Sequence, residues 1–259
     1  QNGFMGNHLA QTLALDPANE IIPFERNYFS DSKALEAFVG HCDAVVHLAA
    51  MNRHPDPEVI YKTNVSLVET LLEACRQKGA TPHILFASST QESRDNLYGK
   101  SKKKGKELLE AWAQKDKGRC TSMTIPNVFG PFGKPNYNSV VATFCHKVAS
   151  GETPEIIQDN EIGLIYVNEL VAEMIAILKE SGASAPPQGA FQTRDISPRH
   201  FRKVSEILNM LKAFREDYMG HGTFPDLEEP FTRALFNTFR CYIPHGHYPA
   251  PFTLHTDPR

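Results

Sequence analysis

Residues 83–109, HILFASSTQESRDNLYGKSKKKGKELL, join a short apolar segment to a longer polar stretch that is rich in lysine. The apolar part, His83–Ala87, predicts a buried strand, and three hydroxyl residues follow it directly. The polar part predicts a helix over Lys100–Gln114. Because ligands bind at the carboxyl ends of strands in open α/β sheets, the three hydroxyl groups mark a candidate site.

The rest of the N-terminal half repeats this alternation of strand and helix. Further strands are expected at Ile21–Glu25, Ala44–Leu48 and Thr121–Ile125, and further helices at Asn7–Leu15, Ser32–Val39 and Val59–Lys78. The strands are short and apolar throughout, which is typical of a parallel sheet covered by helices on both faces. The sequence therefore predicts an α/β fold, a Rossmann-like doubly wound parallel sheet, with a smaller C-terminal substrate-binding portion.

The pattern loosens after Ile125. Residues 126–139, PNVFGPFGKPNYNS, are rich in proline and glycine and predict a loop. Beyond it the expected elements are a helix at Val140–Ala149, a strand feeding a helix within 162–180, a strand at Ala190–Thr193 and a helix from Pro198 capped by Ser197. From Leu227 onward we find no helical period. We expect an NAD(P)-binding domain over residues 1–226, whose substrate-binding portion lies mainly in 127–226, and a separate segment over 227–259.

Composition and charge limit the classes of protein to consider. The 259 residues are 41% hydrophobic with a formal net charge of −3, so they can bury a substantial core and have no global attraction to nucleic acid. No apolar run has transmembrane length, and the five cysteines lack CxxC spacing. Cys241, His245 and His247 offer too few ligands for a metal site. We expect a soluble cytoplasmic protein with no metal, nucleic-acid or membrane partner.

The first residues, QNGFMG, place glycines at positions 3 and 6 immediately before an amphipathic helix. Glycine allows the backbone to approach a pyrophosphate, whose charge then lies at the positive end of the helix. Two glycines before a helix also form a plain turn, so this motif is weak by itself. The first strand and first glycine of the dinucleotide-binding fingerprint are missing, and Gln1 is no initiator. We therefore expect a fragment that lacks its first strand.

Two later segments suit the other parts of a dinucleotide. Residues that follow the second strand of such folds read the adenosine ribose, and here they are Glu25 and Arg26. Glu25 could accept the ribose hydroxyls of NAD, whereas Arg26 could pair with the 2′-phosphate of NADP, and the sequence leaves both open. The segment DAVVHLAA, residues 43–50, ends a strand in small residues against which a nicotinamide ribose can lie. We expect His47 in that strand to be a core histidine.

Tyr98 and Lys102 are four residues apart, so on a helix they lie about 40° apart around the axis. Lowering the pKa of a tyrosine by about three units takes roughly 4 kcal/mol of preferential stabilisation of the phenolate, which an ammonium and a cationic nicotinamide could supply. A nearby serine can hold the substrate oxygen. Gly105 shares this face and indicates a close approach, whereas Lys100, Lys103 and Lys104 point elsewhere.

Together, GFMG, DAVVHLAA, Ser88-Ser89, YGKSK and PNVFG resemble the extended short-chain dehydrogenase/reductases, the nucleotide-sugar epimerases, dehydratases and reductases. The short Ser-to-Tyr spacing, the loop after Ile125 and the tail FNTFRCYIPHGHYPAPF resemble, more narrowly, the capsular-polysaccharide reductases called CapF or WbjC. This resemblance implies a homodimer that uses NADPH, or alternatively NADH, to reduce the 4-keto group of a UDP-linked 2-acetamido-dideoxy sugar on the way to UDP-N-acetyl-L-fucosamine. It also implies that residues 227–259 are a linker and the start of a truncated cupin domain.

The resemblance also assigns roles to single residues. The family's catalytic residues fall on Ser89, Tyr98 and Lys102, with Ser88 or Thr90 as alternatives for the serine. Its cofactor positions fall on Gly3, Phe4, Met5, Gly6, Arg26, Leu48, Ala49, Ala50, Asn64, Tyr98, Lys102 and Asn127. Its substrate positions fall on Ser88, Thr90, Lys134, Asn136, Tyr137 and Asn138.

Three departures from the family pattern bear on the substrate and the reaction. Ile125 stands where an arginine often precedes the proline-asparagine loop, and residues 166–170 read YVNEL in place of the commoner YVDDV. Both leave the substrate contacts open. Residues 90–92, TQE, replace the Asp-Glu pair of the dehydratases, which favours plain reduction. Two alternatives stay open: a 4-epimerase or dehydratase with tightly held NAD, and a redox-silent dinucleotide-binding sensor.

Overall fold

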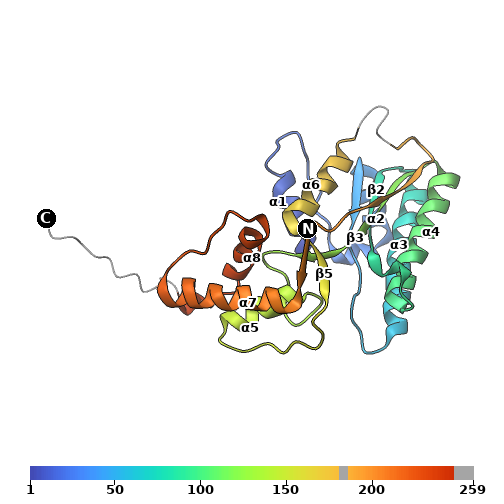
Figure 1. Ribbon diagram of the computed structural model, residues 1–259. Helices are drawn as coiled ribbons and strands as arrows, with labels where there is room; N and C mark the ends of the chain where they lie inside the picture. The colour runs from blue at the N-terminus through green and yellow to red at the C-terminus, as the bar shows by residue number, and fades with distance from the viewer. Residues whose placement is uncertain (181–185, 248–259) are drawn as a thin grey trace. The chain divides into compact units, whose positions relative to one another are not determined.

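The computed structural model describes residues 1–180 and 186–247 (Figure 1). Contacts between residues divide the chain into two compact units. The first comprises Gln1–Pro126 and Asn168–Ser197, and the second comprises Asn127–Val167 and the residues from Pro198 onward. Each unit has its own sheet and its own buried core.

The first unit is built on a four-stranded sheet in the order β1-β2-β3-β6, and every neighbouring pair is parallel. The strands are β1 (Ala44–His47), β2 (His83–Ser89), β3 (Arg119–Ile125) and β6 (Phe191–Asp195). Parallel neighbours need a crossover, which α3 (Pro57–Lys78) supplies between β1 and β2 and α4 (Leu97–Asp116) between β2 and β3. The predicted α/β fold with a Rossmann-like parallel sheet is confirmed.

Helices cover both faces of this sheet. In Figure 1, α3 and α4 lie on one side of it, and α1 (Phe4–Leu13) and α6 (Val167–Leu178) lie on the other. Leu35 and Val39 of α2 (Ser32–His41) join the core that α3 and α4 form with the sheet, where Trp112 is fully buried. The arrangement is therefore doubly wound, as the sequence predicts. Two short 3-10 turns, η1 (Arg26–Ser30) and η2 (Thr90–Ser93), precede α2 and α4.

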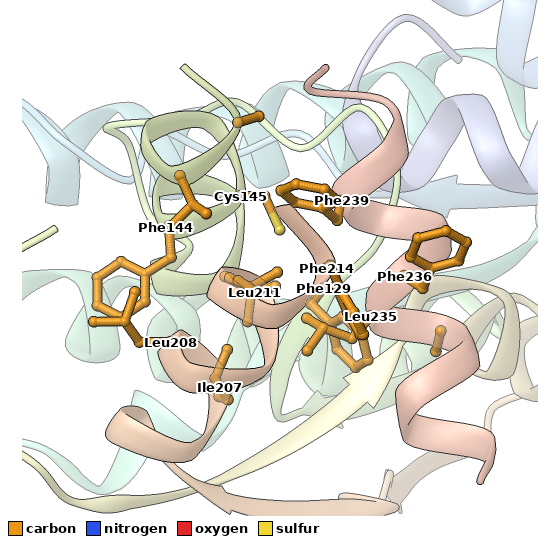
Figure 2. Packing of buried hydrophobic residues seen from close by; sticks show 14 of the residues in the cluster. Phe129, Phe144, Cys145, Ile207, Leu208, Leu211, Phe214, Leu235, Phe236 and Phe239 are labelled. Atoms are coloured by element: carbon orange, nitrogen blue, oxygen red, sulfur yellow. The ribbon is translucent and has the colours of Figure 1, made fainter. Parts of the chain in front are cut away.

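The second unit combines a small mixed sheet with helices. β4 (Asn127–Phe129) pairs in parallel with β5 (Glu161–Tyr166), which pairs antiparallel with β7 (His200–Lys203). The helices are α5 (Val140–Ala149), α7 (Val204–Phe214) with its π-helical extension η4 (Arg215–Gly220), α8 (Pro230–Arg240) and the short turn η5 (His245–His247). Figure 2 shows their common core, which includes Phe129, Phe144, Cys145, Ile207, Leu208, Leu211, Phe214, Leu235, Phe236 and Phe239.

Two expected elements of the sheets differ from the structure. Residues 20–25 run extended but pair with no strand of the described chain, so the expected strand Ile21–Glu25 is wrong. Instead, the backbone of Phe24 is hydrogen-bonded by the side chain of Gln1. The Gln1 amide group donates to the Phe24 carbonyl at 3.1 Å and accepts from the Phe24 amide at 3.2 Å. Conversely, the expected loop contains the short strand β4, because residues 127–129 find a partner in β5.

Two expectations about the C-terminal region are also wrong. The helix expected from Pro198 begins at Val204, because His200–Lys203 pairs with β5 as strand β7 before the helix starts. Residues after Leu227 do form a helix, α8, which Pro230 begins and whose N-cap Glu229 accepts from the amide of Thr232. The buried face of α8 repeats at helical spacing: Phe231, Ala234, Leu235, Thr238 and Phe239. None of the helices in the described residues is long and apolar enough to cross a membrane.

Candidate active site

Lys102 lies on the second turn of α4 and extends toward the carboxyl end of β2. Its Nζ donates to the carbonyl of Ala87 at 2.9 Å and lies 5.0 Å from the centre of the Phe86 ring. The same nitrogen lies 5.8 Å from the centre of the Tyr98 ring. The residue is 3% exposed. The helical face shared by Tyr98 and Lys102 is thus present, and it meets the strand that carries the serines.

The charge of Lys102 is set by burial and by one carboxylate. Burial lowers the pKa of the Lys102 ammonium to about 8, and the negative charge of Glu92 works in the opposite direction. At neutral pH the ammonium therefore stays mainly protonated. A positive charge this close to a phenol favours the phenolate, which is the form that remains after a tyrosine has given its proton away.

The two serines at the end of β2 make different hydrogen bonds. Ser88 is buried and donates its hydroxyl hydrogen to Oε1 of Glu92. Ser89 is half-buried, and its Oγ accepts a hydrogen bond from the amide of Gln91 at 3.2 Å. The hydrogen of Ser88 is therefore committed to a carboxylate, whereas the bond of Ser89 leaves its hydrogen able to point at another acceptor. Thr90, the third alternative, is exposed and begins η2.

Two glycines of α4 allow close approach at the site. A Cβ on Gly99 would lie 2.0 Å from the carbonyl oxygen of Gln91, so the turn η2 could not pack against the start of the helix. A Cβ on Gly105 would lie 2.9 Å from the Phe86 ring and 3.3 Å from Val68. The close approach expected at Gly105 is confirmed, and the approaching groups belong to the protein core. The side chain of Asn96 caps the helix by accepting from the amide of Gly99 at 2.7 Å.

The start of α1 has the features that a pyrophosphate needs. Gly3 is its N-cap in extended conformation and provides no capping side chain, and a Cβ there would meet nothing within 4 Å. Phe4, Met5 and Gly6 form the first turn, whose amides are the unpaired ones of a helix N-terminus. Through the bonds of Gln1 to Phe24, this turn lies beside the segment that ends in the exposed Arg26. These residues fit the phosphates of a dinucleotide.

Asn64 makes its hydrogen bonds within the protein. It is 4% exposed, its Oδ1 accepts from the amide of Met51 at 2.7 Å, and its Nδ2 donates to the Met51 carbonyl and to Ser101 Oγ, each at 3.0 Å. Ser101 in turn donates to the carbonyl of Tyr98 at 2.7 Å. These bonds hold Asn64 within the protein, and its expected contact with a cofactor stays a prediction. Asn64 ties the loop after β1 to the turn that carries Tyr98.

Three small or apolar residues follow β1, and their expected contact with a cofactor stays a prediction. Leu48, Ala49 and Ala50 follow the strand directly. His47 is buried, and its ring stacks on that of Phe86 with centroids 5.8 Å apart. Burial, and next the charge of Lys102, lower the pKa of His47 to about 3, so the imidazole is neutral. His47 is a core histidine, as expected.

Asn127 and four of the six expected substrate residues belong to the second unit, whereas Ser88 and Thr90 lie in the first. Asn127 begins β4 and donates to the carbonyl of Gly163 at 3.3 Å. The other four lie between β4 and α5: Lys134, Asn136, Tyr137 and Asn138. The ammonium of Lys134 lies 5.3 Å from the centre of the Tyr137 ring, and the amide of Asn136 donates to Thr143 Oγ1 at 3.0 Å.

Sequence reasoning missed Glu92 and Lys106. Oε2 of Glu92 lies 3.6 Å from Lys106 Nζ, while its Oε1 accepts from Ser88. No local rule pairs a residue of a short turn with a lysine fourteen positions later. The one available signal is that Lys106 continues the four-residue spacing of Tyr98 and Lys102 along α4. Among the residues that the structure describes, no cluster of His, Cys, Asp or Glu could hold a metal ion.

Comparisons with known proteins find relatives that cover nearly the whole chain. The chain is 31% identical over its whole length to UDP-2-acetamido-2,6-beta-L-arabino-hexul-4-ose reductase from Pseudomonas aeruginosa and covers 67% of it. It is 30% identical to the capsular polysaccharide assembling protein CapF from Staphylococcus aureus, with a TM-score of 0.78 over 99% of this chain and 67% of that one. RMD from Pseudomonas aeruginosa, solved with NADPH, shares the fold at 19% identity, with a TM-score of 0.71 over 93% and 94%.

Most of the chain matches one family model. The model of the NAD dependent epimerase/dehydratase family matches residues 1–189, which include the glycines before α1, the end of β1, both serines, Tyr98 and Lys102. This chain belongs to the NAD dependent epimerase/dehydratase family.

Proposed function

We propose that this chain is an oxidoreductase of the short-chain dehydrogenase/reductase type that uses NADPH to reduce the 4-keto group of a UDP-linked 2-acetamido-dideoxy sugar. The observation that carries the proposal is the buried ammonium of Lys102, held between the end of β2 and the ring of Tyr98. The substrate class is supported by the similarity to the Pseudomonas aeruginosa reductase over the whole of this chain.

Each residue of the site has a definite task in such a reaction. NADPH, when bound, supplies the hydride that adds to C4 of the sugar. Tyr98 gives its phenolic proton to the C4 oxygen, so that the ketone becomes an alcohol, and the phenolate then regains a proton from solvent. Ser89 donates a hydrogen bond to the same oxygen and orients it. Lys102 stabilises the phenolate by its charge, and its ammonium also suits the hydroxyls of the nicotinamide ribose.

The cofactor and the sugar nucleotide would be held by separate groups of residues. The uncapped start of α1 takes the pyrophosphate, and the exposed Arg26 pairs with the 2′-phosphate, which favours NADPH over NADH. The substrate residues are those of the loop between β4 and α5. Lys134 and Tyr137, whose ammonium and ring lie together, suit the phosphates and the base of a UDP-sugar.

The remaining parts of the proposal concern the setting of the enzyme. We infer a homodimer that pairs through α3 and α4, and a role in making precursors of capsule or O-antigen such as UDP-N-acetyl-L-fucosamine. The five free cysteines support a reducing cytoplasm, and the net charge of −3 speaks against nucleic-acid partners. Residues 1–226 would form the NAD(P)-binding domain together with α8, whose buried side chains share the core of the second unit, and the residues after α8 would lead toward a cupin domain.

Replacing Tyr98 by phenylalanine tests the reaction. The Tyr98→Phe variant should lose NADPH oxidation by the 4-keto sugar, because no proton donor remains, and should still bind NADPH with nearly wild-type affinity in a fluorescence titration. Tyr218→Phe, in η4 of the second unit, is the matched control and should keep the wild-type rate. Full activity of Tyr98→Phe would exclude the assignment.

The same preparation separates the rival functions. NAD that co-purifies and stays bound, with interconversion of sugar epimers and no net oxidation of NADPH, would favour a 4-epimerase. Loss of water from a UDP-sugar would favour a dehydratase. Binding of a dinucleotide without turnover of any UDP-sugar would favour a redox-silent sensor.

A further inference from the structure

The carboxylate of Glu92 bridges two parts of the candidate active site. One of its oxygens accepts the hydroxyl hydrogen of Ser88 at the end of β2, and the other lies 3.6 Å from the ammonium of Lys106 on α4. Its side chain is 18% exposed and that of Lys106 is 25% exposed, so the pair is largely sheltered. Pairs of this kind are less screened by salt than exposed ones.

Asp95, a second acidic residue of the same segment, forms an ion pair that is much more exposed to solvent. Asp95 also pairs with a lysine of α4, Lys100, at 2.6 Å, but its side chain is 90% exposed and that of Lys100 is 55% exposed. An exposed pair of this kind contributes little to structure or reactivity. The sheltered position of Glu92, and its bond to a residue beside the candidate catalytic serine, set it apart.

We propose that Glu92 is a positioning residue of this active site: its carboxylate holds the hydroxyl of Ser88 and places a negative charge that offsets the buried ammonium of Lys102. The inference deepens the proposed function, because it concerns the lysine on which that function depends. It assigns a purpose to a carboxylate whose bonds go to Ser88 and Lys106.

The first consequence concerns the two serines. A keto oxygen can only accept hydrogen bonds, so the serine that orients it must donate. With its hydrogen given to Glu92, the buried Ser88 has none left for a keto oxygen. Ser89, whose Oγ accepts from Gln91, keeps its hydrogen for the keto oxygen. Glu92 thus separates the tasks of two adjacent and chemically identical side chains.

The second consequence concerns the charge of Lys102. The titratable groups that bear on it are His47 from β1, Glu92 from η2, and Tyr98 and Lys106 from its own helix. His47 is neutral, so Glu92 is the group that stabilises the ammonium against burial. Removing the charge of Glu92 should make Lys102 lose its proton at lower pH, whereas removing the charge of Lys106 should have the opposite effect, since Glu92 is then less neutralised.

Two substitutions of opposite sign test this directly. The free enzyme is labelled with carbon-13 at the lysine Cε, and the signal of Lys102 is identified as the one missing from Lys102→Met. In the wild type this signal should titrate near pH 8. In Glu92→Gln the midpoint should fall by roughly one pH unit, which is the lower end of what one nearby charge does. In Lys106→Met it should rise.

Asp95→Asn is the matched control, because it removes a carboxylate from the exposed ion pair of the same segment. It should leave the midpoint of Lys102 unchanged. A midpoint that stays fixed in both Glu92→Gln and Lys106→Met would overturn the inference, as would an equal shift in Asp95→Asn. If Glu92→Gln does not fold, Glu92→Asp, which keeps the charge but draws it back by one methylene, should lower the midpoint by a smaller amount, and an unchanged midpoint there would overturn the inference.

The kinetic counterpart uses the pH profile of kcat/KM. In Glu92→Gln the alkaline limb should move to lower pH by the same amount as the Lys102 midpoint, with a modest loss of rate at pH 7. A limb that stays in place while the midpoint moves would overturn the link to turnover. If the wild type shows no turnover of a keto sugar, the proposed function fails, but the Lys102 titration still tests Glu92 by itself.

Discussion

Ser88 and Ser89 occupy adjacent positions, yet their surroundings give them different hydrogen-bonding capacity. A strand places successive side chains on opposite faces, and here one hydroxyl meets a carboxylate while the other accepts from the turn that follows. The sequence leaves the choice among Ser88, Ser89 and Thr90 open, since a shift by one residue cannot be read from a motif. The direction of two hydrogen bonds favours Ser89.

The choice between the serines can be measured. Ser89→Ala should lower kcat by about 100-fold or more, the usual cost of removing one donor to a developing oxyanion. Ser88→Ala should lower it by less than about tenfold, because that hydroxyl serves Glu92. Steady-state kinetics with saturating NADPH and keto sugar provides the comparison. A larger loss in Ser88→Ala than in Ser89→Ala would move the donor role by one residue.

The buried ammonium of Lys102 lowers the free energy of unfolding. Its role in the site explains why a lysine stands there. Its pKa in the folded chain is about 8, below the usual value for a lysine, so the folded state binds the proton more weakly than the unfolded state does. As pH falls from about 10.4 to about 8, the unfolded chain takes up the proton first and stability is lost. Below that window the loss is complete.

Lys102→Met should therefore stabilise the free protein at pH 7. The full linkage would be about 3 kcal/mol, and the carbonyl of Ala87, left without its donor, should reduce the gain to about 1–2 kcal/mol. Urea unfolding at pH 7 and pH 10 measures it, and the gain should shrink at pH 10, where the wild-type lysine is largely neutral. A variant less stable than the wild type at both pH values would contradict the argument. Activity should be lost in the same variant.

At the scale of elements, the sequence predicts those that are fixed by local periodicity. The short apolar runs of β1, β2 and β3 and the amphipathic periods of α2 to α5 can be read from neighbouring residues alone. Strand β7 cannot, because residues 200–203 become a strand by pairing with β5 some forty positions earlier. The strand expected at Ile21–Glu25 is wrong for the converse reason. An apolar run that has no neighbouring strand forms no ladder of hydrogen bonds.

α8 shows a different limit of sequence reading. Its buried positions do follow a helical period, but the intervening residues include aromatics and threonines, so the polar face is hard to recognise. The helix becomes clear through packing, since Phe236 and Phe239 contact the ring of Phe214 on α7 (Figure 2). In the same way, helical geometry predicts the Tyr98 and Lys102 pair, whereas the Glu92 bridge needs the turn η2 to be placed in space.

At the scale of the whole molecule, the candidate residues are divided between two units with separate cores. The residues for proton transfer and nearly all of those for the cofactor lie in the first unit, and the candidate substrate loop lies in the second. Such a division is common where a parallel sheet binds the cofactor at its carboxyl edge and an added portion recognises the substrate.

This division predicts where NADPH changes the dynamics of the chain. NADPH binds the folded state, so it should raise the melting temperature, and amide hydrogen exchange should slow at the start of α1, in η1 and in residues 48–53.

Arg26→Ala should weaken NADPH binding by about tenfold or more, since a charge-assisted pair with the 2′-phosphate is lost, and should leave NADH binding nearly unchanged. Arg233→Ala, in the second unit, is the control. Equal weakening of both cofactors in Arg26→Ala would show that Arg26 does not read the 2′-phosphate, and preferential binding of NADH by the wild type would reassign the ribose contact to Glu25.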